Sequence, residues 1–213
     1  MKQKKSLVSI VLGVALFVGI SSCENVQKEI ADDQVETASL NEENIILHGK
    51  YLVDVMGCND CHSPKRMGPN GPETIKELFL SGYPSDRPII DFDSPLLKEG
   101  FGIFYPDLTA AAGPWGISFA ANLTPDETGI GNWTEEQFKV ALRQGKYKGL
   151  EGSRNMLPPM PWYNYGKMTD EDIHAVYEYL QSIDPVENLV PAAVGPMNII
   201  KLFQILINME ILR

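Results

Sequence analysis

The sequence predicts a single, mainly α-helical domain with long loops between its helices. Helical patterns of apolar residues lie at the two ends of the folded region, near residues 42–57 and 134–185. The segment between them, residues 63–120, is rich in Pro, Gly and aromatic residues. Because no region offers several alternating runs of polar and apolar residues, a fold built on sheets is not predicted.

The first helix is expected to run from about Glu42 to Gly57. Its apolar residues fall on helical faces and are Ile46, Leu47, Leu52, Val53 and Met56. Gly57 marks the end of the helix, as glycine commonly does. Gly49 lies inside the helix, where glycine lowers stability relative to alanine. A second helix that crosses closely at Gly49 would explain why this cost is accepted.

Two further helices are expected later in the chain. Thr134 and Gln137 form a capping-box pattern at the start of one, and Gly145 lies at its exit. The other begins at Thr169 with an acidic first turn, which suits the positive end of the helix dipole. Pro185 ends that helix, because proline cannot continue it.

The most specific motif is Cys58-Asn59-Asp60-Cys61-His62. Two cysteines three apart and an adjacent histidine form the attachment signature of a c-type haem. In this chemistry Cys58 and Cys61 bind the haem vinyl groups as thioethers, and His62 ligates the iron. The alternatives are a zinc half-site and a thioredoxin-like pair. Zinc would need further ligands in a chain with three cysteines and three histidines, and no βαβ pattern supports a thioredoxin-like fold.

The ligand on the other side of the iron decides what such a haem does. Methionine sulfur raises the reduction potential into the range of electron carriers. Met67, Met156 and Met160 are the candidates, and prolines on both sides make the segment around Met160 stiff, which favours it. His48 and His174 are the rival nitrogen ligands.

The N-terminus predicts export. Three lysines among the first five residues precede an apolar run over residues 7–20, which is short for a membrane span. Residues 1–22 are therefore interpreted as a signal peptide. The stretch Ile20-Ser21-Ser22-Cys23 resembles a bacterial lipobox, which implies cleavage before Cys23 and lipidation of its sulfur. Ordinary cleavage that leaves a free thiol is the alternative.

The predicted organisation has four parts. Residues 1–22 are the signal peptide, residues 23–41 a flexible acidic tether, residues 42–190 the folded domain and residues 191–213 an apolar tail. Within the tail, Lys201, Gln204 and Asn208 form a polar stripe at helical spacing. The tail is too short to span a bilayer. A helix packed on the domain or on a partner and an in-plane membrane helix both remain open.

Charge limits the partners. The chain has 18 basic and 28 acidic residues, and removal of residues 1–22 leaves 15 basic residues and a net charge of −13. This sign disfavours nucleic acid. It fits a redox partner with a basic docking patch, since complementary charge speeds encounter. Solubility alone explains the charge equally well.

Several stretches resemble class I cytochromes c, and more narrowly the cytochrome subunits and small cytochromes that accompany periplasmic dehydrogenases. They cover about half of the mature domain in the family's order, and are Gly57–His62, Ala121–Asp126, Thr128–Thr134, Ala141–Gly145, Met160–Trp162 and Met168–Asp172. The resemblance implies a cytochrome c fold with a long loop-rich insertion over residues 63–120. It implies that Met160 ligates the iron opposite His62. It also implies that Gly49 faces Tyr177 or Tyr179 where two helices cross.

The resulting prediction is an electron carrier rather than an enzyme, with one haem c, anchored by lipid on the periplasmic side of a bacterial membrane. A non-catalytic haem subunit of a dehydrogenase complex is the alternative. A haem enzyme or sensor with a displaceable sixth ligand is a further alternative. Trp133 and Trp162 are expected to wall the haem crevice, and Arg143 to contact a propionate. Residues 63–120 are expected to wrap over the haem edge or to form a docking surface.

Overall fold

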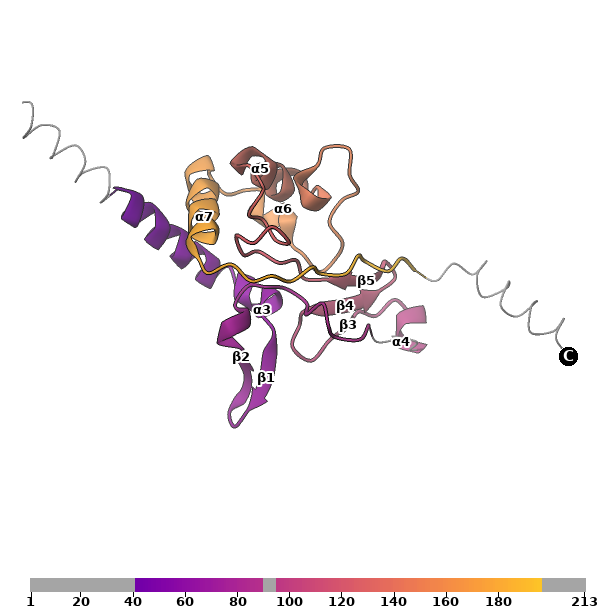
Figure 1. Cartoon of the computed structure of the whole chain (residues 1–213). Helices are drawn as coiled ribbons and strands as arrows, with labels where there is room; N and C mark the ends of the chain where they lie inside the picture. The colour runs from indigo at the N-terminus through magenta and orange to yellow at the C-terminus, as the bar shows by residue number, and fades with distance from the viewer. Residues whose placement is uncertain (1–40, 90–94, 197–213) are drawn as a thin grey trace, which may run out of the picture. The chain divides into compact units, whose positions relative to one another are not determined.

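The computed structural model describes residues 41–89 and 95–196 (Figure 1). The chain divides into two compact units, residues 1–44 and 45–213, and the fold below is that of the second. The predicted signal peptide, Cys23, most of the tether and the tail from residue 197 lie outside the described residues. Among the helices that are described, none combines the length and apolar character needed to cross a membrane.

A helix over residues 41–55 leads to the haem motif, as predicted. Gly57 then takes a left-handed conformation with φ 68°, which glycine adopts without strain, and the chain turns into the short helix α3 (Cys58–His62). A hairpin of β1 (Lys65–Gly68) and β2 (Gly71–Thr74) follows. After it come the 3-10 turn η1 (Lys76–Leu78) and the short helix α4 (Pro95–Lys98).

Residues 103–119 form a small antiparallel sheet, which the sequence did not predict. Its strands β3 (Ile103–Phe104), β4 (Ala110–Gly113) and β5 (Gly116–Phe119) lie in chain order. Three consecutive alanines in β4 are at most 3% exposed. A strand covered on both sides loses the polar–apolar alternation that marks a half-exposed strand, which explains the missing sequence signal.

Three helices complete the domain, with the 3-10 turn η2 (Tyr147–Gly149) after the first. They are α5 (Glu135–Gln144), α6 (Trp162–Tyr165) and α7 (Asp170–Ser182). Both predicted N-caps are present: Thr134 Oγ1 accepts from the Gln137 N–H at 3.2 Å, and Thr169 Oγ1 accepts from the Asp172 N–H at 3.1 Å. The Gln137 side-chain amide donates to the Lys148 carbonyl at 2.8 Å. Gly145 ends α5 in the left-handed conformation, with φ 63°.

The core lies between the first helix, α5 and α7. Its buried members include Val53, Leu80, Phe138, Ile173 and Leu180. Gly49 is buried against α7, where a Cβ would overlap the Ala175 carbonyl and approach Tyr179 Cβ at 2.8 Å. The close crossing at Gly49 is therefore confirmed, with Tyr179 rather than Tyr177 as the neighbour.

The chain after α7 runs back over the domain as a closing segment (residues 186–194). Its first carbonyl, that of Val186, accepts from Asn122 Nδ2 at 2.8 Å. At its far end Val194 and Ile117 of β5 exchange two backbone hydrogen bonds of 2.8 and 2.9 Å. The folded body thus continues past residue 190, and in Figure 1 this segment lies along the sheet.

Candidate haem-binding site

The motif residues lie together on α3. Cys58 and Cys61 are three residues apart on one side of this helix, and both are free thiols of intermediate burial. Lys65 holds the end of the helix, because its ammonium group donates to the carbonyls of Asn59, Asp60 and Ser63 at 3.3, 2.6 and 3.0 Å. The Asn59 carbonyl also accepts the Ser63 N–H at 3.3 Å, and carbonyls at the end of a helix commonly need donors of this kind from outside the helix.

His62 is arranged to present one particular nitrogen. Its side chain is buried, and Nδ1 lies 2.8 Å from the carbonyl oxygen of Ala121. A carbonyl can only accept, so Nδ1 carries the proton and Nε2 keeps a lone pair. Burial lowers the pKa of His62, which keeps the imidazole neutral. A neutral imidazole fixed by a hydrogen bond at its other nitrogen is the usual state of a metal-ligating histidine.

The two thiols are neutral in the unmodified chain. Burial raises the pKa of Cys58 to about 11 and also raises the pKa of Cys61. Zinc binds thiolates. In the described ranges no third histidine, cysteine or carboxylate joins Cys58 and Cys61 in a group that could hold a metal ion. The arrangement fits thioether formation better than a zinc site.

Met160 and Cys58 pack against the same apolar core. Both are partly buried members of its rim, together with Leu123, Trp133, Tyr165 and Met168. This shared core gives both the attachment helix and the Met160 loop an apolar wall, the kind of surrounding that a haem requires. Met67, in contrast, is 75% exposed on β1, and Met156 is half-buried with its N–H bonded to the Gly145 carbonyl at 2.6 Å.

The two rival histidines take part in ion pairs elsewhere. His48 Nε2 lies 2.8 Å from Asp172 Oδ1, and His174 Nδ1 lies 3.2 Å from Glu135 Oε2. Both imidazoles are 40% exposed or more. Each of these two histidines thus lies in an ion pair at the surface.

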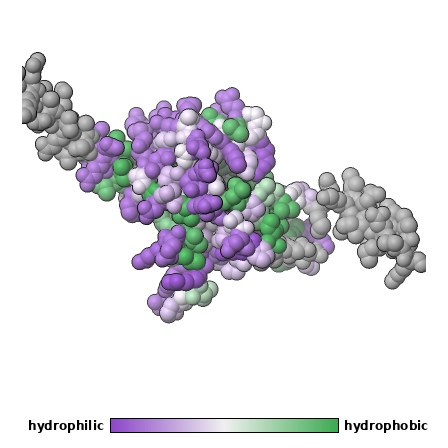
Figure 2. Space-filling view, in the orientation of Figure 1, coloured by the Kyte–Doolittle hydropathy of each residue, from purple (hydrophilic) through white to green (hydrophobic). Residues whose placement is uncertain are grey.

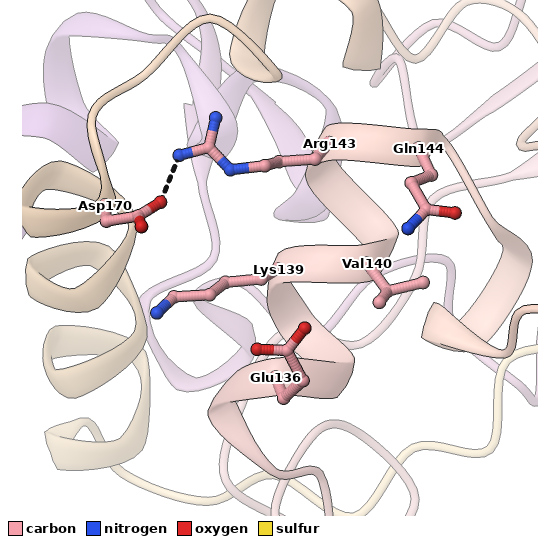
Figure 3. Close-up of a pocket in the computed structure, with 6 residues that line it drawn as sticks. All are labelled: Glu136, Lys139, Val140, Arg143, Gln144 and Asp170. Atoms are coloured by element: carbon pink, nitrogen blue, oxygen red, sulfur yellow. Dashed lines mark hydrogen bonds and ion pairs between the residues drawn. The ribbon is translucent and has the colours of Figure 1, made fainter.

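Arg143 is engaged away from the motif, although it was expected to contact a propionate. It pairs with Asp170 and donates to the Gly166 carbonyl at 3.0 Å. With Lys139 it borders a shallow polar pocket of about 200 Å³ (Figure 3). The pocket is lined by Glu136, Lys139, Val140, Arg143, Gln144 and Asp170. Lys139 is itself paired with Glu135 at 3.0 Å, so both cations are already neutralised.

The two tryptophans differ in position. Trp133 is partly buried against the core, and its carbonyl accepts from the Tyr177 hydroxyl at 2.8 Å. Trp162 packs its ring over Gly145 at the end of α5, where a side chain on residue 145 would overlap it. Trp133 therefore adjoins the apolar wall, whereas the contacts of Trp162 are with the α5 exit.

Several site residues gave no sequence signal. Tyr165 donates to the Met56 carbonyl at 3.1 Å, and burial raises the pKa of its phenol, with a further contribution from the neighbouring Cys58 and Cys61 thiols. Lys65 and Ser118 also contact the site, although a lone lysine or serine between loops carries no pattern.

The site geometry agrees with the comparisons. Residues 46–184 match the cytochrome c family. The chain is similar to the gluconate 2-dehydrogenase cytochrome c subunit of Pantoea cypripedii, with 28% identity over 85% of this chain and 30% of that protein. It is 40% identical to the fructose dehydrogenase cytochrome subunit of Gluconobacter japonicus over 67% of this chain and 22% of that protein.

A third relative is the cytochrome c subunit of the quinone-dependent alcohol dehydrogenase of Gluconobacter oxydans. It is 37% identical over 40% of this chain and 18% of that protein. The matched stretches span less than a third of each of these relatives. Together with the Cys-x-x-Cys-His helix and the buried histidine held by the Ala121 carbonyl, these matches show that the chain belongs to the cytochrome c family.

Proposed function

We propose that this chain transfers electrons through one haem c, bound covalently by Cys58 and Cys61 and ligated by His62 and Met160. The bound haem supplies a reversible one-electron change at iron. The observation that carries the proposal is the neutral His62 with its Nδ1–H fixed on the Ala121 carbonyl, on the same short helix as both free thiols.

The protein residues hold and shield the group. The Ala121 carbonyl orients the imidazole, and the core rim around Cys58 and Met160 excludes water. With His62 and Met160 both bound, the iron would have no open position for a substrate. This is why the proposal is a carrier, and not a haem enzyme or sensor with a displaceable ligand.

A second candidate is a non-catalytic haem subunit of a dehydrogenase complex. The three relatives named above are, by their names, cytochrome subunits of dehydrogenases. This chain also exposes apolar side chains over the segment from α4 to β4, and Figure 2 shows hydrophobic patches on an otherwise largely hydrophilic face. These side chains are Leu96, Phe101, Phe104 and Leu108, with exposed fractions of 39–56%.

The proposed location follows from the sequence. Export by residues 1–22 and lipidation of Cys23 would anchor the domain through residues 23–41 on the periplasmic side of a bacterial membrane. The net charge of −13 after cleavage would favour a donor or acceptor with a basic docking patch. Mass spectrometry of the membrane-extracted protein tests the anchor, since lipidation adds mass at a new N-terminal Cys23.

The ligand set is tested by absorption spectra of the haem-loaded protein, oxidised and reduced. Ferric iron bound to methionine sulfur gives a weak long-wavelength charge-transfer band, which we expect in the wild type. It should vanish in Met160→Ala and persist in Met156→Ala, a matched control from the same loop. A wild type without the band that binds carbon monoxide readily when reduced would overturn the carrier proposal. Native mass of the detergent-extracted protein separates a free carrier from a subunit.

A further inference from the structure

Ser118 connects the small sheet to the loop that carries Met160. Its Oγ lies 2.6 Å from the carbonyl oxygen of Pro158, two residues before Met160. The serine is 9% exposed and lies on β5, directly opposite Ala111 of β4. A buried strand residue therefore contacts the backbone of the proposed sixth-ligand loop, 40 residues further along the chain.

The direction of this hydrogen bond follows from the chemistry of its partners. A carbonyl accepts, so the Ser118 hydroxyl donates to Pro158. The Ala111 carbonyl is a more distant acceptor at 3.3 Å. Trp115 Nε1 lies 3.3 Å from Ser118 Oγ and can donate to its lone pair, which orients the hydroxyl towards Pro158. These contacts satisfy both functions of the hydroxyl.

The Met160 loop has few means of anchoring itself. Pro158, Pro159 and Pro161 have no N–H, so only Met160 can donate a backbone hydrogen bond within this stretch. That donor reaches the Leu157 carbonyl of the same loop at 3.3 Å. The Ser118 bond instead joins the loop to a different element, which is fixed by its pairing with β4 and with Val194.

We infer that Ser118 is a positioning residue for the sixth ligand: its bond to Pro158 holds the loop so that the Met160 sulfur stays at the iron. The inference rests on the proposed ligation by Met160. It gives residues 103–119 a task in the haem site, because the sheet provides the rigid support that a proline-rich loop lacks. Without this bond, an added ligand should displace the Met160 sulfur from the iron more easily, although the residues of the loop itself are unchanged.

Displacement of Met160 by added imidazole tests this role in the haem-loaded, full-length ferric protein. We expect Ser118→Ala to need about tenfold less imidazole for half-displacement, since a net hydrogen bond of this kind corresponds to roughly that factor. The reduction potential should fall in the same variant, because a weaker Met–iron bond favours the ferric form. Ser118→Thr keeps the hydroxyl and should restore both values towards those of the wild type.

Ser153→Ala is the matched control from the same connection between η2 and α6, because Ser153 Oγ bonds to the Tyr147 carbonyl at 2.8 Å and lies outside the stretch from Pro158 to Pro161. It should leave imidazole displacement unchanged. If Ser118→Ala behaves like Ser153→Ala while the wild type shows the methionine band, the role of Ser118 is overturned and the proposed function stands. If the wild type lacks the band, ligation by Met160 fails, and the role of Ser118 fails with it. A lower unfolding temperature without altered displacement also overturns the role.

Discussion

The ammonium group of Lys65 lies 3.2 Å from the backbone carbonyl oxygen of Asp107, 42 residues further along the chain. The same ammonium group bonds to three carbonyls at the end of α3. One side chain thus joins the haem-attachment helix to the turn before β4. Charged donors make the stronger protein hydrogen bonds, so this junction contributes to the stability of the site.

Lys65→Met keeps most of the aliphatic stem and removes the donor. We expect a loss of about 1.5–3 kcal/mol in the free energy of unfolding, the range for hydrogen bonds that involve a charged group. Denaturant unfolding of the haem-loaded protein measures it. Lys76→Met, at an exposed position in η1, is the control and should change the value by less than about 0.5 kcal/mol. Equal losses of unfolding free energy for the two variants would show that the hydrogen bonds of Lys65 do not stabilise the domain.

Arg87 and Asp107 form a largely buried ion pair. Their closest atoms are 2.8 Å apart, and the side chains are 20% and 6% exposed. The guanidinium also lies over the rings of Tyr83 and Tyr105, at 5.1 and 4.7 Å. Asp107→Asn would leave this cation without its counter-ion, so we expect a loss of about 3–5 kcal/mol in unfolding experiments. A loss below about 1 kcal/mol would mean that water reaches the pair and screens it.

The ion pair of Arg87 and Asp107 makes the stability of the domain depend on pH. Burial alone would raise the pKa of Asp107, but hydrogen bonds from Arg87 and Thr109 outweigh it and bring the pKa below its usual value. The stabilisation is therefore present above the unfolded pKa of about 3.9 and is lost as the pH falls through the lower folded value. The stability difference between wild type and Asp107→Asn should shrink below about pH 4. A difference that is constant from pH 7 to pH 3 would contradict this.

Asn188 makes the central polar contact of the closing segment. It is 7% exposed, donates to the Ser81 and Tyr83 carbonyls at 2.6 and 3.0 Å, and accepts from the Ser85 N–H at 2.8 Å. Asn188→Ala leaves three backbone groups without their hydrogen-bond partner, and we expect a loss of roughly 2–4 kcal/mol in the free energy of unfolding. Thermal unfolding should show this, with Asn155→Ala at an exposed site as a near-neutral control. Equal unfolding temperatures for the two variants would contradict the assignment.

Gly49→Ala should be destabilising although alanine favours helices. A Cβ at this position overlaps the Ala175 carbonyl of α7, which is backbone and cannot move aside cheaply. Overpacking of this kind costs about 1–3 kcal/mol and exceeds the gain of about 0.5–1 kcal/mol in helix propensity. Gly152→Ala is the control, because its Cβ would have no neighbour within 4 Å. Net stabilisation by Gly49→Ala would show that the crossing is looser than the structure indicates.

The sequence predicted those parts of the fold that depend on neighbouring residues. Caps at Thr134 and Thr169 and the exit at Gly145 follow from local backbone needs, and each is present. Gly49 was informative because a glycine inside a helix needs a reason, and that reason was a partner helix. The haem motif itself is a local pattern, which placed Cys58 and His62 on one short helix.

Contacts between distant segments could not be predicted in this way. The sheet over residues 103–119 was not predicted because its central alanines are covered on both faces. Ser118 lies 40 residues from Pro158, and Asn188 lies more than 100 residues from the carbonyls that it holds. Single polar residues such as these have no periodicity, so their partners appear only once the chain is folded.

The closing segment also makes the folded domain depend on residues near the end of its sequence. Asn188 bonds to the Ser81 and Tyr83 carbonyls, and Val194 bonds to Ile117 of β5, so the loop over residues 81–83 and the sheet gain these contacts only when residues 186–194 are in place. A chain that ends before Val186 should therefore unfold at a lower temperature than the full chain.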